Sequence, residues 1–407
     1  MAENAATRLT DFVSIGVLAK VFRRDLIEEM IAETDTREKR SRLLPAHLVV
    51  YYVLALALFF GEGYDEVMRK LVCGLRFLKN WDRDWNVPST SAISQARARL
   101  GEAPLKALFE RVAVPMARRG TRGAWLRDWR VMAIDGVVID MPDTPANNAE
   151  YVHSSGGKGS GAFPAMRIVA LAECGTHAII DAALGTWTTG ERTLAEQVLR
   201  SLDPGMLMLA DRGYYSYDLW GKARETGAAL VFRVAGNVNL SMFERYPDGS
   251  YRSVLLPPRT QSTVRKLAAR RGDPSVLEAA GTACRVVEYT LENRGDPTEV
   301  IRLITSVLDW EQAPAHELAA LYHDRWEIEL SFREIEIHQV GHPRVLRSKS
   351  PEMVRQEVWG ILLAHYAIRH LMHEAADTAD VDPDRLSFLR SLQIIRRQIT
   401  GQADFSP

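Results

Sequence analysis

The residues best suited to chemistry lie in one stretch, 318–340, which reads LAALYHDRWEIELSFREIEIHQV and predicts one long helix. At about 100° per residue, one face of it, an arc of roughly 80°, carries five polar side chains. They are Tyr322, Arg325, Glu329, Arg333 and Glu336. A carboxylate between cations suits a site that holds a divalent metal ion beside a phosphate. This stripe of five polar side chains fits an exposed helix face with ion pairs equally well. The helix alone therefore does not distinguish a metal and phosphate site from a solvated surface.

Two further acidic residues stand out because their neighbours are apolar. Asp135 lies inside VMAIDGVVID, which reads as a buried strand, and Asp211 directly follows the predicted strand MLMLA. An ionised carboxylate is costly to bury unless it is paired or bound to a metal. Such carboxylates, facing a third on a packed helix, can bind two divalent ions that activate an attacking oxygen and stabilise the leaving oxygen of a phosphodiester. Magnesium suits such all-oxygen sites.

Each of these acidic residues also has an ordinary structural interpretation. Asp135 fits a hydrogen-bonded buried carboxylate, and Asp211 fits a turn or a helix cap. The order Asp, Asp, Glu, on a strand, at a strand end and on a helix, is more specific than any one of the three. We therefore take Asp135, Asp211 and Glu329 as the candidate catalytic and metal-binding residues.

The elements that must position these residues predict an α/β protein. Three consecutive strands followed by alternating helix and strand indicate a mixed sheet. The expected division is a helical N-terminal domain at 1–125, a first part of the catalytic core at 126–235, a mostly β insertion at 236–312, the catalytic core helix at 313–345 and C-terminal helices at 346–407. The longest apolar run, 48–60, is too short to span a bilayer and predicts a buried helix.

The charge distribution points to a polyanion partner only locally. The net charge is −1, but residues 61–130 hold 14 Lys and Arg against 8 Asp and Glu, which gives +6. Within this region, Arg97 and Arg99 lie on one predicted helix and are candidates for binding DNA phosphates. An ordinary solvated helix face is the alternative.

The cysteines and the N-terminus predict a cytoplasmic protein with no membrane partner. Cys73, Cys174 and Cys284 are odd in number and far apart, which fits a reducing compartment without a disulfide framework or a zinc site. The first residues, MAENAATRLTDFVS, lack the basic-then-apolar pattern of a signal peptide.

With these motifs, the chain resembles the DDE transposases of bacterial insertion sequences, in the insertion-sequence-four group. That group carries a Tyr-x2-Arg-x3-Glu-x6-Lys signature on its catalytic helix, and Tyr322, Arg325 and Glu329 stand at this spacing. AIDG around Asp135 and LADRGYYS around Asp211 resemble the group's other two blocks. The segments LTDFVSIGVLAKVF, RSRLLPAHLVVYYVLAL, SAISQARARLG and LRSKSPEMVRQEVWGILLAHYAIRHLM extend the resemblance over nearly the whole length.

The resemblance implies an RNase H-like core in which Asp135, Asp211 and Glu329 bind two Mg²⁺ ions, with Mn²⁺ as an alternative. Arg325 would contact a phosphate near the cleavage site, and Tyr322 would hydrogen-bond a terminal phosphate. The β insertion would help to hold a DNA hairpin or a flipped base. A water and then a freed 3′-hydroxyl would attack phosphodiesters. The reaction would be cut-and-paste transposition on double-stranded DNA, run by a homodimer across the inverted-repeat ends and the target.

One position departs from the signature, because Glu336 stands where the group has Lys. Arg333 one turn earlier could replace that Lys, Lys349 could reach in, or this copy is impaired; we favour Arg333 as a DNA contact. The insertion also lacks the Trp expected to stack on a base, since 236–309 contains none. The aromatic options there are Phe243, Tyr246 and Tyr289.

Three functions compete at this point. The first is an active, sequence-specific DNA transposase, which the intact Asp135, Asp211, Glu329, Tyr322 and Arg325 favour. The second is a metal-dependent nuclease that cuts DNA without joining it. The third is a DNA-binding protein derived from a transposase, for which Glu336 is the argument.

Overall fold

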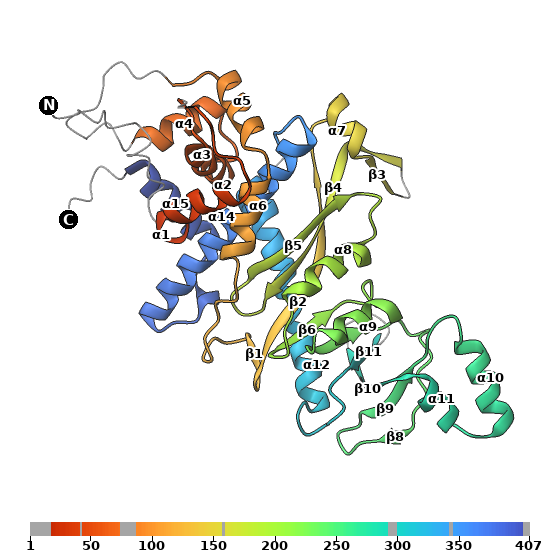
Figure 1. Ribbon diagram of the computed structural model, residues 1–407. Helices are drawn as coiled ribbons and strands as arrows, with labels where there is room; N and C mark the ends of the chain where they lie inside the picture. The colour runs from red at the N-terminus through yellow and green to blue at the C-terminus, as the bar shows by residue number, and fades with distance from the viewer. Residues whose placement is uncertain are drawn as a thin grey trace.

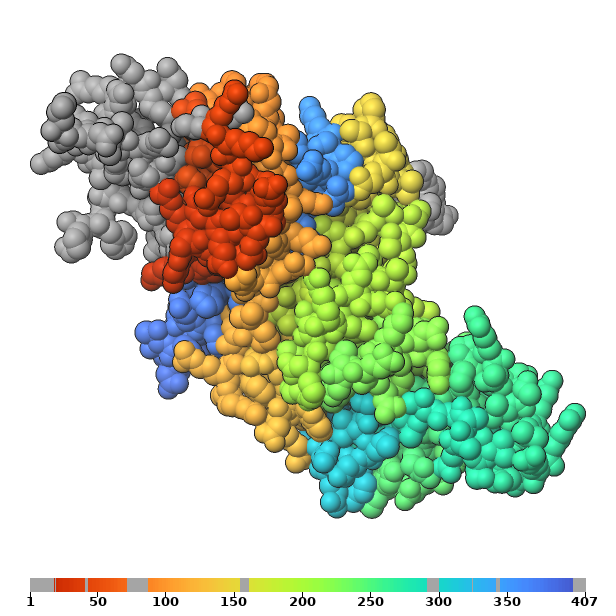
Figure 2. All heavy atoms as spheres, in the orientation of Figure 1, coloured from red at the N-terminus to blue at the C-terminus, as the bar shows by residue number. Residues whose placement is uncertain are grey.

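A mixed sheet of eleven strands forms the centre of the molecule. The computed structural model describes residues 18–40, 43–73, 87–156, 159–291, 299–341 and 345–401. Helices from both ends of the chain pack together at one end of the sheet, and the insertion lies at the opposite end (Figure 1). The space-filling view shows the insertion projecting from that end (Figure 2).

Five strands make the core of the sheet. They are β2 (Trp129–Asp140), β4 (Gly159–Glu173), β5 (Ala178–Thr186), β6 (Met206–Ala210) and β7 (Ala229–Arg233). Their order is β5-β4-β2-β6-β7; the β5-β4 and β4-β2 pairs are antiparallel, and the β2-β6 and β6-β7 pairs are parallel. A parallel pair needs a crossover connection, which α8 (Glu191–Val198) and α9 (Tyr217–Glu225) supply. The expected mixed α/β sheet is confirmed.

The insertion continues the same sheet. Its strands are β8 (Glu244–Arg245), β9 (Tyr251–Leu255), β10 (Thr282–Leu291) and β11 (Glu299–Thr305), and two helices, α10 (Gln261–Arg271) and α11 (Ser275–Ala280), lie between β9 and β10. Strand β11 pairs antiparallel with β7, from Leu303 opposite Arg233 to Thr305 opposite Val231. Backbone hydrogen bonds therefore join the insertion to the core.

Short elements complete the sheet region. They are β1 (Trp125–Leu126), α7 (Pro145–Glu150), β3 (His153–Gly156) and the 3₁₀ turns η2 (Leu199–Ser201) and η4 (Pro383–Arg385). β1 pairs with β2, and β3 pairs with β4.

The terminal helices form one packed body. They are α1 (Leu18–Val21), α2 (Arg24–Glu33), α3 (Ala46–Leu58), α4 (Tyr64–Cys73), α5 (Thr90–Leu100), α6 (Ala103–Val112), α14 (Pro351–Ala379) and α15 (Phe388–Gly401). The 29-residue α14 contacts α3, α5, α6 and strand β5. Every residue of α3 is buried, which confirms the predicted buried helix. No helix in the described part of the chain has the length and apolar character needed to cross a bilayer.

The predicted long helix 318–340 differs from expectation. It consists of α12 (Ala315–Asp324), α13 (Trp326–Arg333) and a π-helical segment, η3 (Glu334–Val340). The first break falls at Arg325, one of the predicted site residues. A π-helix turns less per residue than an α-helix, so residues after Arg333, including Glu336, rotate out of the expected stripe.

Helices α3 and α14 approach closely at a glycine. A Cβ placed on Gly360 of α14 would lie 2.7 Å from Cγ1 of Val53 on α3 and 3.3 Å from the Val53 carbonyl oxygen. Such separations are shorter than van der Waals contact, so the two helices can pack at this distance only because residue 360 has no side chain.

Gly360→Ala is expected to lower the free energy of unfolding by about 1–3 kcal/mol, because the added methyl forces α3 and α14 apart. Gly221→Ala in α9 is the matched control. Nothing lies within 4 Å of its added Cβ, and alanine favours a helix over glycine by about 1 kcal/mol. Denaturant unfolding of both variants measures the difference; equal stability would contradict the packing argument.

Candidate active site

Five predicted residues meet where β2, the end of β6 and the interrupted helix α12–α13 come together. Asp135 lies in the middle of β2, and Asp211 directly follows β6, which pairs with β2. Tyr322 lies in the last turn of α12, Arg325 occupies the break, and Glu329 lies on α13. The sheet therefore carries two of the carboxylates, and the helix brings the third.

Arg325 connects the carboxylates. Its Nη2 donates to Oε1 of Glu329 at 3.0 Å, and its Nη1 lies 3.5 Å from Oδ2 of Asp135. The residue is only 8% exposed. Burial by itself would lower the pKa of Arg325, but Tyr322 and the three carboxylates raise it, so the guanidinium stays charged and compensates for their negative charge.

Tyr322 contacts the carboxylate of Asp211. Its hydroxyl donates to Oδ1 of Asp211 at 3.1 Å, and the Arg325 guanidinium lies 5.9 Å from the centre of its ring. Burial, and then the charge of Asp211, raise the pKa of the Tyr322 phenol. Tyr322 therefore remains a neutral hydrogen-bond donor at physiological pH.

The three carboxylates do not yet form a compact metal site. Among the described residues, one group of three His, Cys, Asp or Glu side chains has its ligand atoms all within 4.8 Å of one another, and that group is His177, Glu327 and Asp384. Arg325 lies between Asp135 and Glu329 instead. Their oxygen donors suit Mg²⁺ or Mn²⁺, and Arg325 has to move aside for them to share an ion.

Asp135 carries the clearest electrostatic signature of the site. Its pKa is raised to about 6, mainly by burial and also by Glu329 and Asp211, whereas the Gly136 amide and Arg325 oppose this shift. The amide nitrogen of Gly136 donates to Oδ1 at 2.8 Å. The metal-free site therefore favours a protonated Asp135 more than an exposed carboxyl would.

Asp135→Asn is expected to stabilise the metal-free protein by about 1–3 kcal/mol at pH 8. A carboxyl whose folded pKa is raised from 3.8 to about 6 costs stability only when it ionises. That cost is absent below about pH 3.8 and complete above about pH 6, so the gain should shrink as the pH falls through this window. Thermal unfolding with a chelator at several pH values measures the stability gain of Asp135→Asn. A gain independent of pH would show that it does not come from the ionisation of Asp135.

Comparisons with known proteins agree with this geometry. The family model described as the insertion element 4 transposase N-terminal matches residues 12–110, and the transposase DDE domain matches residues 127–367. Transposase InsG for insertion sequence element IS4 of Escherichia coli is 30% identical over 387 residues, which cover 94% of this chain and 82% of that protein. The chain belongs to the IS4 family of DDE transposases.

Two further likenesses are more limited. The putative transposase InsZ of Escherichia coli is 30% identical over 184 residues, 44% of this chain and 58% of that protein. The cryo-EM structure of the piggyBac transposase synaptic complex with hairpin DNA aligns with a TM-score of 0.47 and 11% identity, over 94% of this chain and 79% of that one.

The family match confirms several expectations. The DDE domain, together with the strand order of the core, confirms the RNase H-like fold. The protein is a DNA transposase, an enzyme that depends on divalent metal to cleave and join DNA strands. The roles of individual residues remain predictions.

Two residues beside the candidate site, Tyr214 and Trp326, were not singled out by the sequence analysis. Tyr214 is 2% exposed, and its hydroxyl finds no hydrogen-bond partner in the described structure. This hydroxyl lies 3.0 Å from the position that a Cβ on Gly136 would take, next to Asp135. Trp326 follows Arg325 and is 56% exposed, with the Arg325 guanidinium 5.7 Å from its ring centre. The LADRGYYS block contains Tyr214 but indicated no role for it. Trp326 is an isolated tryptophan, and its position in the sequence indicated no function.

The prediction that Arg97 contacts DNA is wrong. Its side chain is 1% exposed and lies between α5 and α14. Nε donates to Gln356 at 2.8 Å, and the terminal nitrogens donate to the hydroxyls of Tyr64 at 2.6 Å and Ser348 at 3.0 Å. Helix periodicity could not reveal a partner 259 residues away. Arg99, two positions on, is exposed, and its DNA contact stays a prediction.

Arg97→Ala is expected to lower the free energy of unfolding by about 2–4 kcal/mol, because it leaves buried polar partners unsatisfied. Arg99→Ala should change stability by less than about 0.5 kcal/mol. It should reduce the salt dependence of DNA binding by about one phosphate contact. Denaturant unfolding and salt titrations of DNA binding test both variants. If the slope of log binding constant against log salt concentration is unchanged in Arg99→Ala, Arg99 on α5 does not contact a DNA phosphate.

Arg333 and Glu336 lie differently from the expected stripe. Arg333 is exposed and lines a cavity together with His177 and Asp384. Glu336 belongs to η3 and is half-buried. Arg333 as the substitute for the signature Lys therefore remains a prediction, and it would need its long side chain to extend towards the DNA.

Proposed function

We propose that this transposase excises and inserts an insertion sequence by a cut-and-paste reaction. Asp135, Asp211 and Glu329 would hold two Mg²⁺ ions, with Mn²⁺ as a substitute. Bound at these oxygens, the ions would activate the attacking oxygen and stabilise the leaving oxygen of a phosphodiester. The observation that carries the proposal is the convergence of the three carboxylates around one buried guanidinium.

Arg325 and Tyr322 are proposed to change partners when DNA arrives. Arg325 now pairs with Asp135 and Glu329, and Tyr322 donates to Asp211. Metal ions would take over the compensation of the carboxylates, which frees both donors. A guanidinium and a phenol next to a scissile phosphate can then bind its oxygens, Arg325 near the cleaved bond and Tyr322 at the terminal phosphate.

The partner is proposed to be double-stranded DNA at the inverted-repeat ends and at the target. A homodimer would hold two ends together, and the mass of the complex with end DNA measures that stoichiometry. The exposed Arg99 and Arg333 are the proposed phosphate contacts of the helical N-terminal domain and the catalytic helix. We also propose that the enzyme works in the cytoplasm, on the bacterial nucleoid.

Asp135→Asn, Asp211→Asn and Glu329→Gln should each reduce cleavage of end DNA by about 100-fold or more, because each removes an anionic ligand. DNA binding should be largely retained. Glu317→Gln on α12, whose carboxylate pairs with Arg127 at 3.0 Å, is the matched control and should cleave normally. A magnesium-dependent assay with end DNA measures cleavage and joining together.

The same assay separates the competing functions. Cleaved ends that are also joined to target DNA support transposition, whereas cleavage without joined product would favour a nuclease. Binding without either product would favour an impaired protein. Loss of DNA binding in all three carboxylate variants would contradict the proposed roles.

A further inference from the structure

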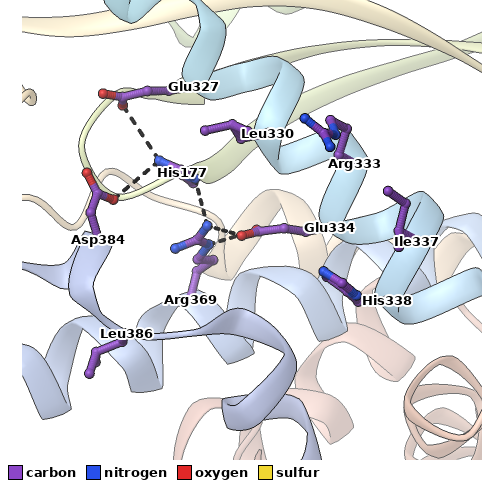
Figure 3. Close-up of a pocket in the computed structure, with 10 residues that line it drawn as sticks. All are labelled: His177, Glu327, Leu330, Arg333, Glu334, Ile337, His338, Arg369, Asp384 and Leu386. Atoms are coloured by element: carbon purple, nitrogen blue, oxygen red, sulfur yellow. Dashed lines mark hydrogen bonds and ion pairs between the residues drawn. The ribbon is translucent and has the colours of Figure 1, made fainter.

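The cavity that Arg333 lines also borders the helix that carries Glu329. It encloses about 550 Å³ and is bordered by α13, η3, α14 and η4. The side chains that matter here are His177, Glu327, Glu334, Arg369 and Asp384, which converge on one corner of the cavity (Figure 3). We call it the His177 cavity. The proposed reaction uses none of these five residues.

Three potential ligands meet at this corner. Nε2 of His177 lies 3.4 Å from Oδ1 of Asp384 and 3.9 Å from Oε2 of Glu327, and all three ligand atoms lie within 4.8 Å of one another. Tetrahedral bonds of about 2.0–2.2 Å to nitrogen and oxygen separate ligand atoms by roughly 3.3–3.6 Å. The three atoms are therefore close to the spacing of a metal site, and only Glu327 needs a small shift.

The charges at this corner favour a cation. Nη2 of Arg369 can only donate, and it lies 2.6 Å from Nδ1 of His177, so this nitrogen carries no proton and the imidazole is neutral and can act as a ligand. Arg369 pairs with Glu334, to which its Nε donates at 2.9 Å. The cavity is lined by three carboxylates, those of Glu327, Glu334 and Asp384, and by the guanidiniums of Arg333 and Arg369. Since Arg369 is paired with Glu334, the carboxylates of Glu327 and Asp384 beside His177 can attract a divalent cation.

The backbone at His177 is held in a costly conformation. Its φ of 59° is in the left-handed region, which residues other than glycine rarely adopt. The residue lies in the turn between β4 and β5 and is 5% exposed. A strained, buried histidine whose ring nitrogen faces a cavity is typical of a functional position.

We propose that His177, Glu327 and Asp384 bind one divalent ion of the zinc class, separate from the catalytic ions. One imidazole nitrogen and two carboxylate oxygens are a ligand set that Zn²⁺ accepts, with water completing the coordination. The ion would connect the β4–β5 turn, α13 and η4. Because Glu327 is two residues before Glu329, this ion would fix the position of the helix that carries the third catalytic carboxylate.

The proton balance at His177 defines how the ion binds. A neutral imidazole has one N–H and one lone pair. Nη2 of Arg369 lies 2.6 Å from Nδ1 and donates to it, which leaves the proton on Nε2, facing Asp384. An ion on Nε2 moves that proton to Nδ1, and Arg369 then binds only Glu334, with which it already makes two hydrogen bonds.

The full-length Asp135→Asn, Asp211→Asn, Glu329→Gln triple variant, which lacks the catalytic ligands, tests this proposal. Dialysed against Zn²⁺ and then metal-free buffer, it should retain one ion per chain by elemental analysis. Adding His177→Asn should reduce the retained ion at least tenfold, and asparagine tolerates the positive φ of this position. His338→Asn, in the lining of the same cavity, is the matched control and should retain the ion.

Co²⁺ absorption gives a readout independent of activity, because a nitrogen-ligated Co²⁺ should lose its visible bands with His177→Asn and keep them with His338→Asn. If a variant fails to fold, Asp384→Asn in the otherwise unchanged protein should lower the bound metal by one ion per chain. No retained ion in the triple variant, or equal retention with His177→Asn, would overturn the proposal.

Discussion

The buried guanidinium of Arg325 is the interaction on which the catalytic region depends. Three carboxylates brought together by a sheet and a helix repel one another and lose hydration, so they need a positive charge among them. Arg325 supplies this charge: it contacts Asp135 and Glu329, and the charge of Asp211 also raises its pKa. Arg325 lies at the junction of α12 and α13. In the proposed reaction, metal ions would compete with Arg325 for these carboxylates, and this exchange would link metal binding to phosphate binding.

The scaffold behind this site holds the helix from its far side. Glu334, where the π-helical segment begins, accepts hydrogen bonds from Arg369 and pairs with His365, both on α14. Burial alone would raise the pKa of Glu334, but these two partners lower it, so it remains an anion. A carboxylate fixed in this way anchors η3 to α14. The π-helical geometry directs the residues that follow towards this anchor instead of continuing the stripe of Glu329.

The sequence revealed the parts of the site that depend on local spacing. Asp135 in an apolar strand, Asp211 at a strand end and the Tyr322–Arg325–Glu329 pattern were recognisable because strand and helix periods are short-range properties. The prediction for Arg97 was wrong because its burial depends on long-range contacts: its partners Gln356 and Ser348 are about 250 positions away along the chain. The π-helical turn and the helix break have no comparable signature, because tertiary contacts decide them. The continuation of the central sheet into the insertion was equally hidden, since pairing of β7 with β11 joins segments separated by three strands and two helices.

The packing of α3 against α14 also has a consequence for synthesis on the ribosome. All thirteen residues of α3 are buried, and part of the surface that covers them belongs to a helix that begins at Pro351. The emerging N-terminal half therefore exposes an apolar helix until most of the polypeptide has been translated, a state that chaperones and proteases recognise. A prematurely terminated polypeptide that stops before α14 keeps this surface open. The cell would degrade such a fragment rather than accumulate an N-terminal part without the catalytic core.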